Sequence, residues 1–165
     1  MKESMNLEEY IEEALLKLMK EKEFKNITIT DITNKAGVSR ISFYRKFSSK
    51  EDVVKSYLTK ALKDWAKRWE ESGDTNIAYQ IFKFFYEQKE VLPLLYQSNL
   101  QYLLEENILS ACGYKEGMNE IEAYIKVMVA YIIYGWCTEW YKRGMKETPE
   151  EMSKKFEAVN NQQKK

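Results

Sequence analysis

A short segment near the N-terminus contains several residues that typically start or end helices. These residues are only a few positions apart, so the helices between them must be short. Thr28 and Asp31 have the spacing of a capping box, in which each side chain accepts a hydrogen bond from the other residue's backbone N–H. Gly37 tolerates a left-handed backbone and is predicted to end that helix. Ser39 can cap a second short helix, expected to run through Phe47. A short helix, a glycine turn and a second short helix are the elements of a helix-turn-helix motif.

The rest of the chain also has helical periodicity. Six glycines and two prolines are few for an all-β fold, which needs many tight turns. Asn6 with Glu9 predicts the start of a first helix, and Ser49 with Asp52 starts a long fourth one. Further helices are expected at about 75–89, 98–111 and 118–143 and from Pro149 onward, with a break or a short helix at Pro93.

The expected fold is therefore all-α, and the Ser72-Gly73-Asp74 break is the best candidate for a domain joint. We predict a helix-turn-helix domain at residues 1–50, a connecting helix at 51–72 and a helical-bundle domain at 73–165.

Composition excludes several kinds of chemistry. The chain has no histidine, and its two cysteines, Cys112 and Cys137, are far apart in the sequence. Zinc sites built from Cys and His, and Ser-His-Asp or Cys-His catalysis, are therefore excluded. We expect no metal, no cofactor and no enzymatic activity. The polar start of the chain, and an uncharged apolar run (Val127–Thr138) too short to span a bilayer, predict a cytoplasmic protein that does not enter the membrane.

Positive charge is concentrated around the predicted motif, although the whole chain has a formal net charge of zero. Between Lys25 and Lys50 there are six cations and one anion, Asp31. Such a cluster indicates either a solvated basic face or a surface that binds phosphate groups.

The motif's apolar residues suggest which side faces outward. Ile29, Ile32, Ala36 and Val38 can pack the two short helices together, while Phe43 and Phe47, four residues apart, can anchor the second to the first helix of the chain. The side chains left to face outward are Arg40, Ile41, Ser42, Tyr44, Arg45 and Lys46. Hydroxyl groups and Lys bind phosphates, and Arg can pair with a guanine edge, so this is a candidate DNA-reading surface.

The segment 27–52 resembles the N-terminal signature of the tetracycline-repressor (TetR) family of transcriptional regulators. The matching marks are Ala-Gly-Val-Ser at 36–39, Phe-Tyr at 43–44, Phe47 and Ser-Lys-Glu at 49–51. The resemblance covers about the first third of the chain. It implies a fold of about nine helices, with the first three or four forming the DNA-binding domain.

The resemblance also implies roles for single residues. The residue at Thr28 caps its helix near a phosphate, and Lys50, at the start of the fourth helix, faces a phosphate. Ile41 departs from the family pattern, in which a small residue is common, and it can contact a thymine methyl group or simply pack. The expected DNA-contacting residues are Thr28, Thr30, Ser39, Arg40, Ile41, Ser42, Tyr44, Lys46 and Lys50.

The C-terminal half is similar to one subgroup of this family, through Gly135-Trp136-Cys137-Thr138-Glu139-Trp140-Tyr141 and Thr148-Pro149-Glu150-Glu151-Met152. That similarity implies a homodimer joined through the 118–143 helix and the last helix. The 118–143 helix is apolar around much of its circumference, which is consistent with such an interface, because an uncovered face would leave a large exposed apolar patch. The alternative is that this helix is buried wholly within its own chain.

Aromatic residues and one methionine at helical spacings in the central helices are candidates for lining an effector pocket, although such stripes more often form plain core. These residues are Phe82, Phe85, Tyr86, Tyr96, Tyr102, Tyr124, Met128 and Tyr131. The predicted function is a dimeric repressor that a small-molecule effector, of unknown identity, releases from a pseudo-palindromic operator in double-stranded DNA. The alternatives are a DNA-binding factor without an inducer, and a small helical carrier or enzyme.

Overall fold

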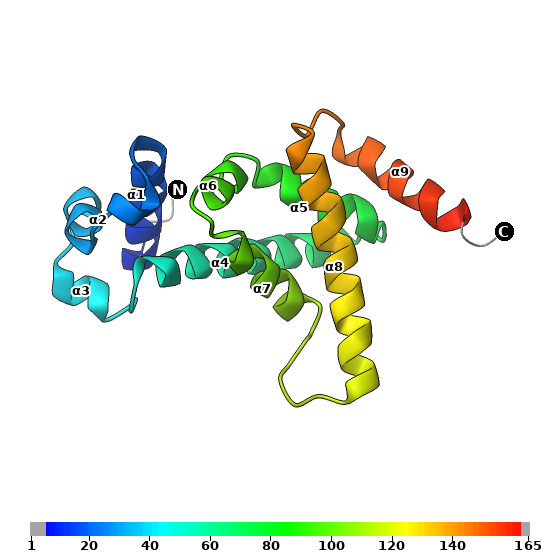
Figure 1. Cartoon of the computed structure of the whole chain (residues 1–165), viewed down its shortest axis with the longest axis horizontal. Coiled ribbons are helices and arrows are strands. Elements are labelled where there is room, and N and C mark those ends of the chain that lie inside the picture. The colour runs from blue at the N-terminus through cyan, green and yellow to red at the C-terminus, as the bar shows by residue number, and fades with distance from the viewer. Residues whose placement is uncertain (1–5, 163–165) are drawn as a thin grey trace. The chain divides into compact units, whose positions relative to one another are not determined.

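The computed structural model describes residues 6–162, and within them the chain is all-α with no strand (Figure 1). The helices are α1 (Leu7–Glu21), α2 (Ile29–Ala36), α3 (Arg40–Tyr44), α4 (Lys50–Ser72), α5 (Ile77–Glu87), α6 (Leu92–Gln97), α7 (Gln101–Ala111), α8 (Glu120–Lys142) and α9 (Pro149–Gln162). A 3₁₀ turn, η1 (Phe24–Asn26), follows α1. The predicted fold class, with about nine helices, is confirmed.

The expected caps set the helix ends. Capping boxes start α1 at Asn6 and α2 at Thr28. A similar reciprocal pair starts α9, where the Thr148 N–H donates to the Glu151 carboxylate and the Glu151 N–H donates to the Thr148 hydroxyl. The helix α3 ends at Tyr44, earlier than predicted, although the Phe47 N–H still bonds to the Phe43 carbonyl in the turn that follows.

The chain forms two compact units, and the boundary between them falls inside α4. The first unit runs to Lys60 and also contains Pro93–Leu104, while the second contains Ala61–Leu92 and the chain from Glu105 onward. Contacts thus group the segment around α6 with the N-terminal helices. The sequence-based limits at residues 50 and 72 stay a prediction about independent domains.

The first unit is built on a core from α1 to α4. Ile11, Leu15, Ile32 and Phe43 are completely buried, as the helical period of α1 requires. Glu12 of α1 is also buried, where it accepts a hydrogen bond from the Ser56 hydroxyl of α4. Burial away from water raises the pKa of this carboxyl.

The second unit has an aromatic core where α5 meets α8 and α9. Phe82 of α5 is buried, and its ring meets Trp136 and Trp140 of α8 and Phe156 of α9, at centroid distances of 6.3, 5.7 and 6.3 Å. Such edge-to-face contacts add to the free energy of apolar burial.

The apolar helix α8 does not have the character of a membrane span. Within residues 6–162, no helix is long and apolar enough to cross a lipid bilayer.

Candidate DNA-binding surface

The turn between α2 and α3 is fixed by short-range hydrogen bonds. Gly37 ends α2 with φ at 68°, a left-handed conformation that costs a glycine little. Ser39 then caps α3, since its hydroxyl accepts a hydrogen bond from the Ser42 N–H at 3.0 Å. Together these two residues set the direction in which α3 leaves the turn.

The start of α2 is held by a charged network. The Asp31 carboxylate accepts hydrogen bonds from the Lys22 ammonium at 2.7 Å and from the Thr28 backbone N–H at 2.8 Å. The Lys22 contact, followed by the bonds from Thr28, holds the pKa of Asp31 well below its usual range. Asp31 therefore stays ionised at neutral pH and keeps the capping box closed.

Two phenylalanines fix the rotation of α3 about its axis. Phe43 is completely buried and Phe47 nearly so, with ring centroids 5.8 Å apart. With that side of α3 inside, Arg40, Ile41 and Tyr44 are exposed, and Ile41 and Tyr44 are 70% and 52% accessible.

The predicted DNA-contacting residues are mostly exposed and lie in α2, α3 and the turns around them. Thr28, Thr30, Ser39 and Lys46 are exposed, while Ser42 and Lys50 are half-buried. The hydroxyls of Ser39 and Ser42 lie 2.9 Å apart and share a hydrogen bond. DNA contact by these residues stays a prediction, since exposure alone does not establish it.

Carboxylates of the same unit neutralise several cations of this surface. Lys46 pairs with Glu8 at 2.8 Å and Lys35 with Glu21 at 2.5 Å, and both carboxylates belong to α1. Lys25 pairs with Glu23 at 2.9 Å. The sequence count of six cations thus overstates the free positive charge.

Arg40 and Arg45 differ from these lysines. Among the residues from 6 to 162, neither guanidinium has an ion pair or hydrogen bond with another side chain. Both are exposed on or next to α3. Each keeps its donors available for a planar acceptor such as a guanine edge or a phosphate.

Lys50 makes contacts that the sequence did not suggest. Its ammonium donates hydrogen bonds to the carbonyl oxygens of Phe24 and Ile27, at 2.6 and 3.0 Å, and lies 4.4 Å from the centre of the Phe24 ring. An ammonium has three donors, so these bonds engage two of them. Lys50 ties the start of α4 to the η1 turn, and its predicted phosphate contact would have to use the remaining donor.

The predicted effector-pocket residues are dispersed. Phe82 and Phe85 are buried, and Tyr86 stacks on Trp140 with centroids 6.0 Å apart. Tyr96 belongs to the first unit and is half-buried. The remaining four are exposed on α7 or α8: Tyr102, Tyr124, Met128 and Tyr131. Of the eight, Phe82 lines a small cavity of about 30 Å³ next to Ile133 and Phe156, and an effector contact stays a prediction for all of them.

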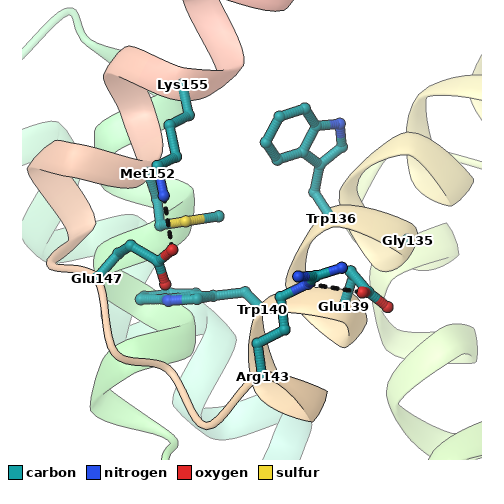
Figure 2. A pocket seen from close by; sticks show the side chains of 8 residues that line it. All are labelled: Gly135, Trp136, Glu139, Trp140, Arg143, Glu147, Met152 and Lys155. Atoms are coloured by element: carbon teal, nitrogen blue, oxygen red, sulfur yellow. Dashed lines mark hydrogen bonds and ion pairs between the residues drawn. The ribbon is translucent and has the colours of Figure 1, made fainter.

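A larger opening lies elsewhere, between α8 and α9, and we call it the α8–α9 hollow (Figure 2). Its volume is about 480 Å³, within the usual range for sites that bind small molecules. The lining residues are Gly135, Trp136, Glu139, Trp140, Arg143, Glu147, Met152 and Lys155. In Figure 2 the Trp140 ring reaches from α8 toward Glu147 and Met152, and Trp136 stands on the other side.

The hollow has an apolar interior and a charged rim. Two ion pairs stand at its edge, Glu139 with Arg143 at 2.8 Å and Glu147 with Lys155 at 2.6 Å (Figure 2). The hydrogen bond from Lys155 lowers the pKa of Glu147. The indole N–H of Trp140 is buried and has no hydrogen-bond partner in the described part of the chain. The sequence pattern gave no sign of this hollow.

Comparison with known proteins agrees with the helix-turn-helix geometry. The model of bacterial regulatory proteins of the tetR family matches residues 11–57, and a model of a transcriptional regulator C-terminal region, TetR_C_8, matches residues 75–162. The chain belongs to the TetR family. The expectation drawn from Ala36-Gly37-Val38-Ser39 and its neighbours is confirmed, and the family is one of transcriptional regulators.

Solved structures of two regulators share the fold at low sequence identity. A TetR-family transcriptional regulator from Syntrophomonas wolfei is 19% identical, with 90% of this chain and 89% of that chain covered and a TM-score of 0.55. The fatty acid degradation regulator FadR from Bacillus halodurans is 16% identical, with 93% of each chain covered and a TM-score of 0.53. No curated protein matches the sequence.

Proposed function

We propose that this TetR-family regulator binds a pseudo-palindromic operator as a homodimer, and that a small-molecule effector releases it. The single observation that carries the DNA-binding part is the outward face of α3. It exposes Arg40, Ile41 and Tyr44 above a buried Phe43, on a helix whose N-terminus is capped and positioned by Ser39. A recognition helix contacts base edges in the major groove with residues near its N-terminus. An arginine can pair with a guanine edge there, and an apolar side chain can contact a thymine methyl group.

Each predicted contact has a chemical role in this proposal. Arg40 pairs with a base edge, Ile41 meets a thymine methyl group, and Tyr44 and Lys46 bind backbone phosphates. Thr28 and Thr30 place the first helix of the motif against the backbone. Lys46 must leave Glu8 to reach a phosphate, so its contribution to binding is smaller than that of an unpaired lysine.

The homodimer is supported by the exposed apolar surface of α8. Ile121, Tyr124 and Met128 are 71%, 67% and 58% accessible, in a helix whose buried residues are Ala130, Cys137 and Trp140. A second copy joined through α8 and the last helix would cover this surface. Two recognition helices would then meet successive major grooves, spaced by about 34–36 Å on B-form DNA.

For effector release, the candidate lever is α4. This single helix starts in the first unit at Lys50 and ends in the second unit near Trp65 and Trp69. An effector that binds more tightly to a conformation with a different position of α4 would shift the population away from the DNA-bound form.

The test starts by selecting bound sequences from random duplex DNA. We expect one enriched pseudo-palindrome, and binding that weakens steeply with salt. A protein that binds no duplex even at low salt would overturn the proposal and favour a helical carrier or enzyme. Titrating candidate small molecules against the selected operator then separates an inducible repressor from a factor that responds to no effector.

A further inference from the structure

The α8–α9 hollow is a cavity that no site predicted from the sequence accounts for. None of the predicted DNA-contacting or effector-pocket residues lines it, and its walls come from α8, α9 and the segment that joins them. Its volume of about 480 Å³ is enough for a small organic molecule. The chemistry of its walls therefore determines which kind of molecule fits.

Two indole rings form the apolar walls of the hollow, and aromatic contacts behind them hold both in place. Trp136 packs edge-on against Phe156, with ring centroids 5.2 Å apart. Trp140 packs edge-on against Phe82 at 5.7 Å and stacks on Tyr86 at 6.0 Å. Because these rings are already ordered, a ligand that packs against the indoles does not have to order them first. An aromatic ligand would gain offset or edge-to-face contacts with them.

Gly135 leaves the α8 side of the hollow flat. A Cβ atom built at this position meets nothing within 4 Å, so the described part of the chain leaves that space open. Glycine is disfavoured inside a helix, but it is favoured where a ligand or another backbone approaches closely. A flat molecule can therefore lie against the backbone of α8 at this point.

Both carboxylates at the rim are already paired, whereas part of one cation is free. Glu139 is bonded to Arg143 and Glu147 to Lys155. The Arg143 side chain uses only its Nε–H for this bond, and among residues 6–162 its terminal N–H groups have no acceptor. In Figure 2 the guanidinium lies between Trp136 and the Glu139 carboxylate. A planar guanidinium edge binds a carboxylate through two parallel hydrogen bonds.

The indole N–H of Trp140 is a second donor without a partner. It is buried and lacks an acceptor among residues 6–162, which is uncommon for a buried polar group. In Figure 2 the nitrogen of the ring lies on the side of Glu147 and Met152, both of which line the hollow. Methionine is flexible, so a shift of Met152 would open this N–H to an acceptor on a ligand. The groups left over for a ligand are thus donors.

We infer that the α8–α9 hollow binds a small aromatic carboxylate, with its rings against Trp136 and Trp140 and its carboxylate on the free edge of Arg143. The inference rests on the proposed function, because it assigns the unidentified effector to this hollow and to this chemical class. The aromatic walls select the rings, and the unused guanidinium edge selects the anion.

Isothermal titration calorimetry of the full chain without DNA tests the ligand class, with naphthoate as the probe. Naphthoate has two fused rings and a carboxylate, and its neutral amide has nearly the same shape without the charge. We expect naphthoate to bind, and the amide to bind about tenfold more weakly, as for lost hydrogen bonds to a charged group. Equal affinities would overturn the role of Arg143. No binding of naphthoate up to millimolar concentration, as expected if a second copy covers the hollow, would overturn the site.

Two variants with opposite expected effects locate the carboxylate. Arg143→Gln should weaken naphthoate binding about tenfold, because it removes the guanidinium edge. Glu139→Gln should tighten it, since it frees the Nε–H of Arg143 and removes a negative charge from the rim. Lys142→Gln is the matched control, an exposed cation next to Arg143 but outside the hollow, and it should leave the affinity unchanged. Equal losses in Arg143→Gln and Lys142→Gln, or weaker binding by Glu139→Gln, would contradict the inference.

Filling the hollow tests the position of the rings. Gly135→Leu places a good helix former in open space, so the chain should keep its helicity and lose naphthoate binding. Ala66→Leu introduces a leucine at an exposed position of α4 and should bind naphthoate as the wild type does. If Gly135→Leu loses helicity, the Arg143 and Glu139 variants decide.

The outcomes separate this inference from the proposed function. An effector found by titration against the operator should be about tenfold less potent on Arg143→Gln than on Lys142→Gln. Equal potency on both would place the effector elsewhere, which overturns the inference and leaves the regulator standing. A chain that binds naphthoate with the expected variant pattern but binds no duplex DNA would support the hollow as a binding site and overturn the proposed function.

Discussion

The surface around α3 and the surface of α8 are both exposed, but their side chains have different partners. Around α3, carboxylates of the same unit neutralise Lys35 and Lys46. Along the N-terminal half of α8, the apolar side chains of Ile121, Ile125 and Met128 are each more than half exposed. The comparison teaches that exposed cations can be balanced by carboxylates of the same unit, whereas exposed apolar side chains gain no such compensation from their own unit.

The largest expected effect concerns the core beneath the α3 surface. Phe43→Ala removes a completely buried ring and should lower the free energy of unfolding by about 3–5 kcal/mol. Ile41→Ala, two residues away but 70% exposed, should change it by less than about 0.5 kcal/mol. Urea denaturation followed by circular dichroism measures both. Equal losses would mean that the outward face of α3 is buried in solution.

Lys50 differs from the other cations near α3, because its ammonium donates hydrogen bonds to backbone carbonyls of its own unit. Lys50→Met keeps the side-chain stem against Phe24 but leaves two carbonyl oxygens without their donor. We expect the free energy of unfolding to fall by about 1–3 kcal/mol, as for lost hydrogen bonds to a charged group.

DNA binding by the same variant tests the predicted phosphate contact of Lys50. The affinity for all sequences should fall together, and the salt slope should drop by about one. An unchanged slope with a lower stability would assign Lys50 to the fold alone.

Within residues 6–162 the Arg40 guanidinium has no ion pair, so its loss should affect DNA recognition rather than stability. Arg40→Ala should weaken operator binding by about 1–3 kcal/mol and relax the preference at one base pair. Fluorescence anisotropy on the operator and its single-base variants measures this. Lys67→Ala, an exposed cation of α4 in the second unit, serves as the control and should leave base preference intact.

The smallest effect tests the internal neutralisation directly. Glu8→Gln frees Lys46 and should tighten binding to random duplex DNA by about 0.2–1 kcal/mol, the usual range for an exposed ion pair. Glu13→Gln changes the net charge equally, but Glu13 pairs with Lys17 of its own helix. If the two variants bind DNA equally well, net charge alone is responsible and the Glu8 contact is unimportant.

Local sequence signals predicted the helix-turn-helix well. Caps such as Thr28, Ser39 and Gly37 act over three or four residues, so their effect is visible in a single sequence. The four-residue spacing of Phe43 and Phe47 likewise indicated which side of α3 is buried. The end of α3 was less predictable, because a helix of five residues depends on its surroundings.

Contacts between distant residues were not predictable in the same way. Nothing near Lys46 in the sequence points to Glu8, and nothing near Lys50 points to the carbonyl of Phe24. The spacing of apolar residues in α8 is the same whether the helix face that carries them is exposed or buried. For this reason Tyr124 and Met128 were candidates for lining an internal pocket. Assigning such faces needs the packing of the whole unit.

If the surface around α3 binds DNA as proposed, the ion pairs of Lys35 and Lys46 with carboxylates of α1 have a consequence for how fast the protein finds its target. Non-specific attachment to a chromosome depends almost entirely on free cations, and each lysine held by a carboxylate subtracts from it. A regulator with weak attachment spends less time on irrelevant duplex and more in free diffusion between segments. In the proposed function, Glu8 and Glu21 would thus favour a search by many brief encounters over one by long sliding.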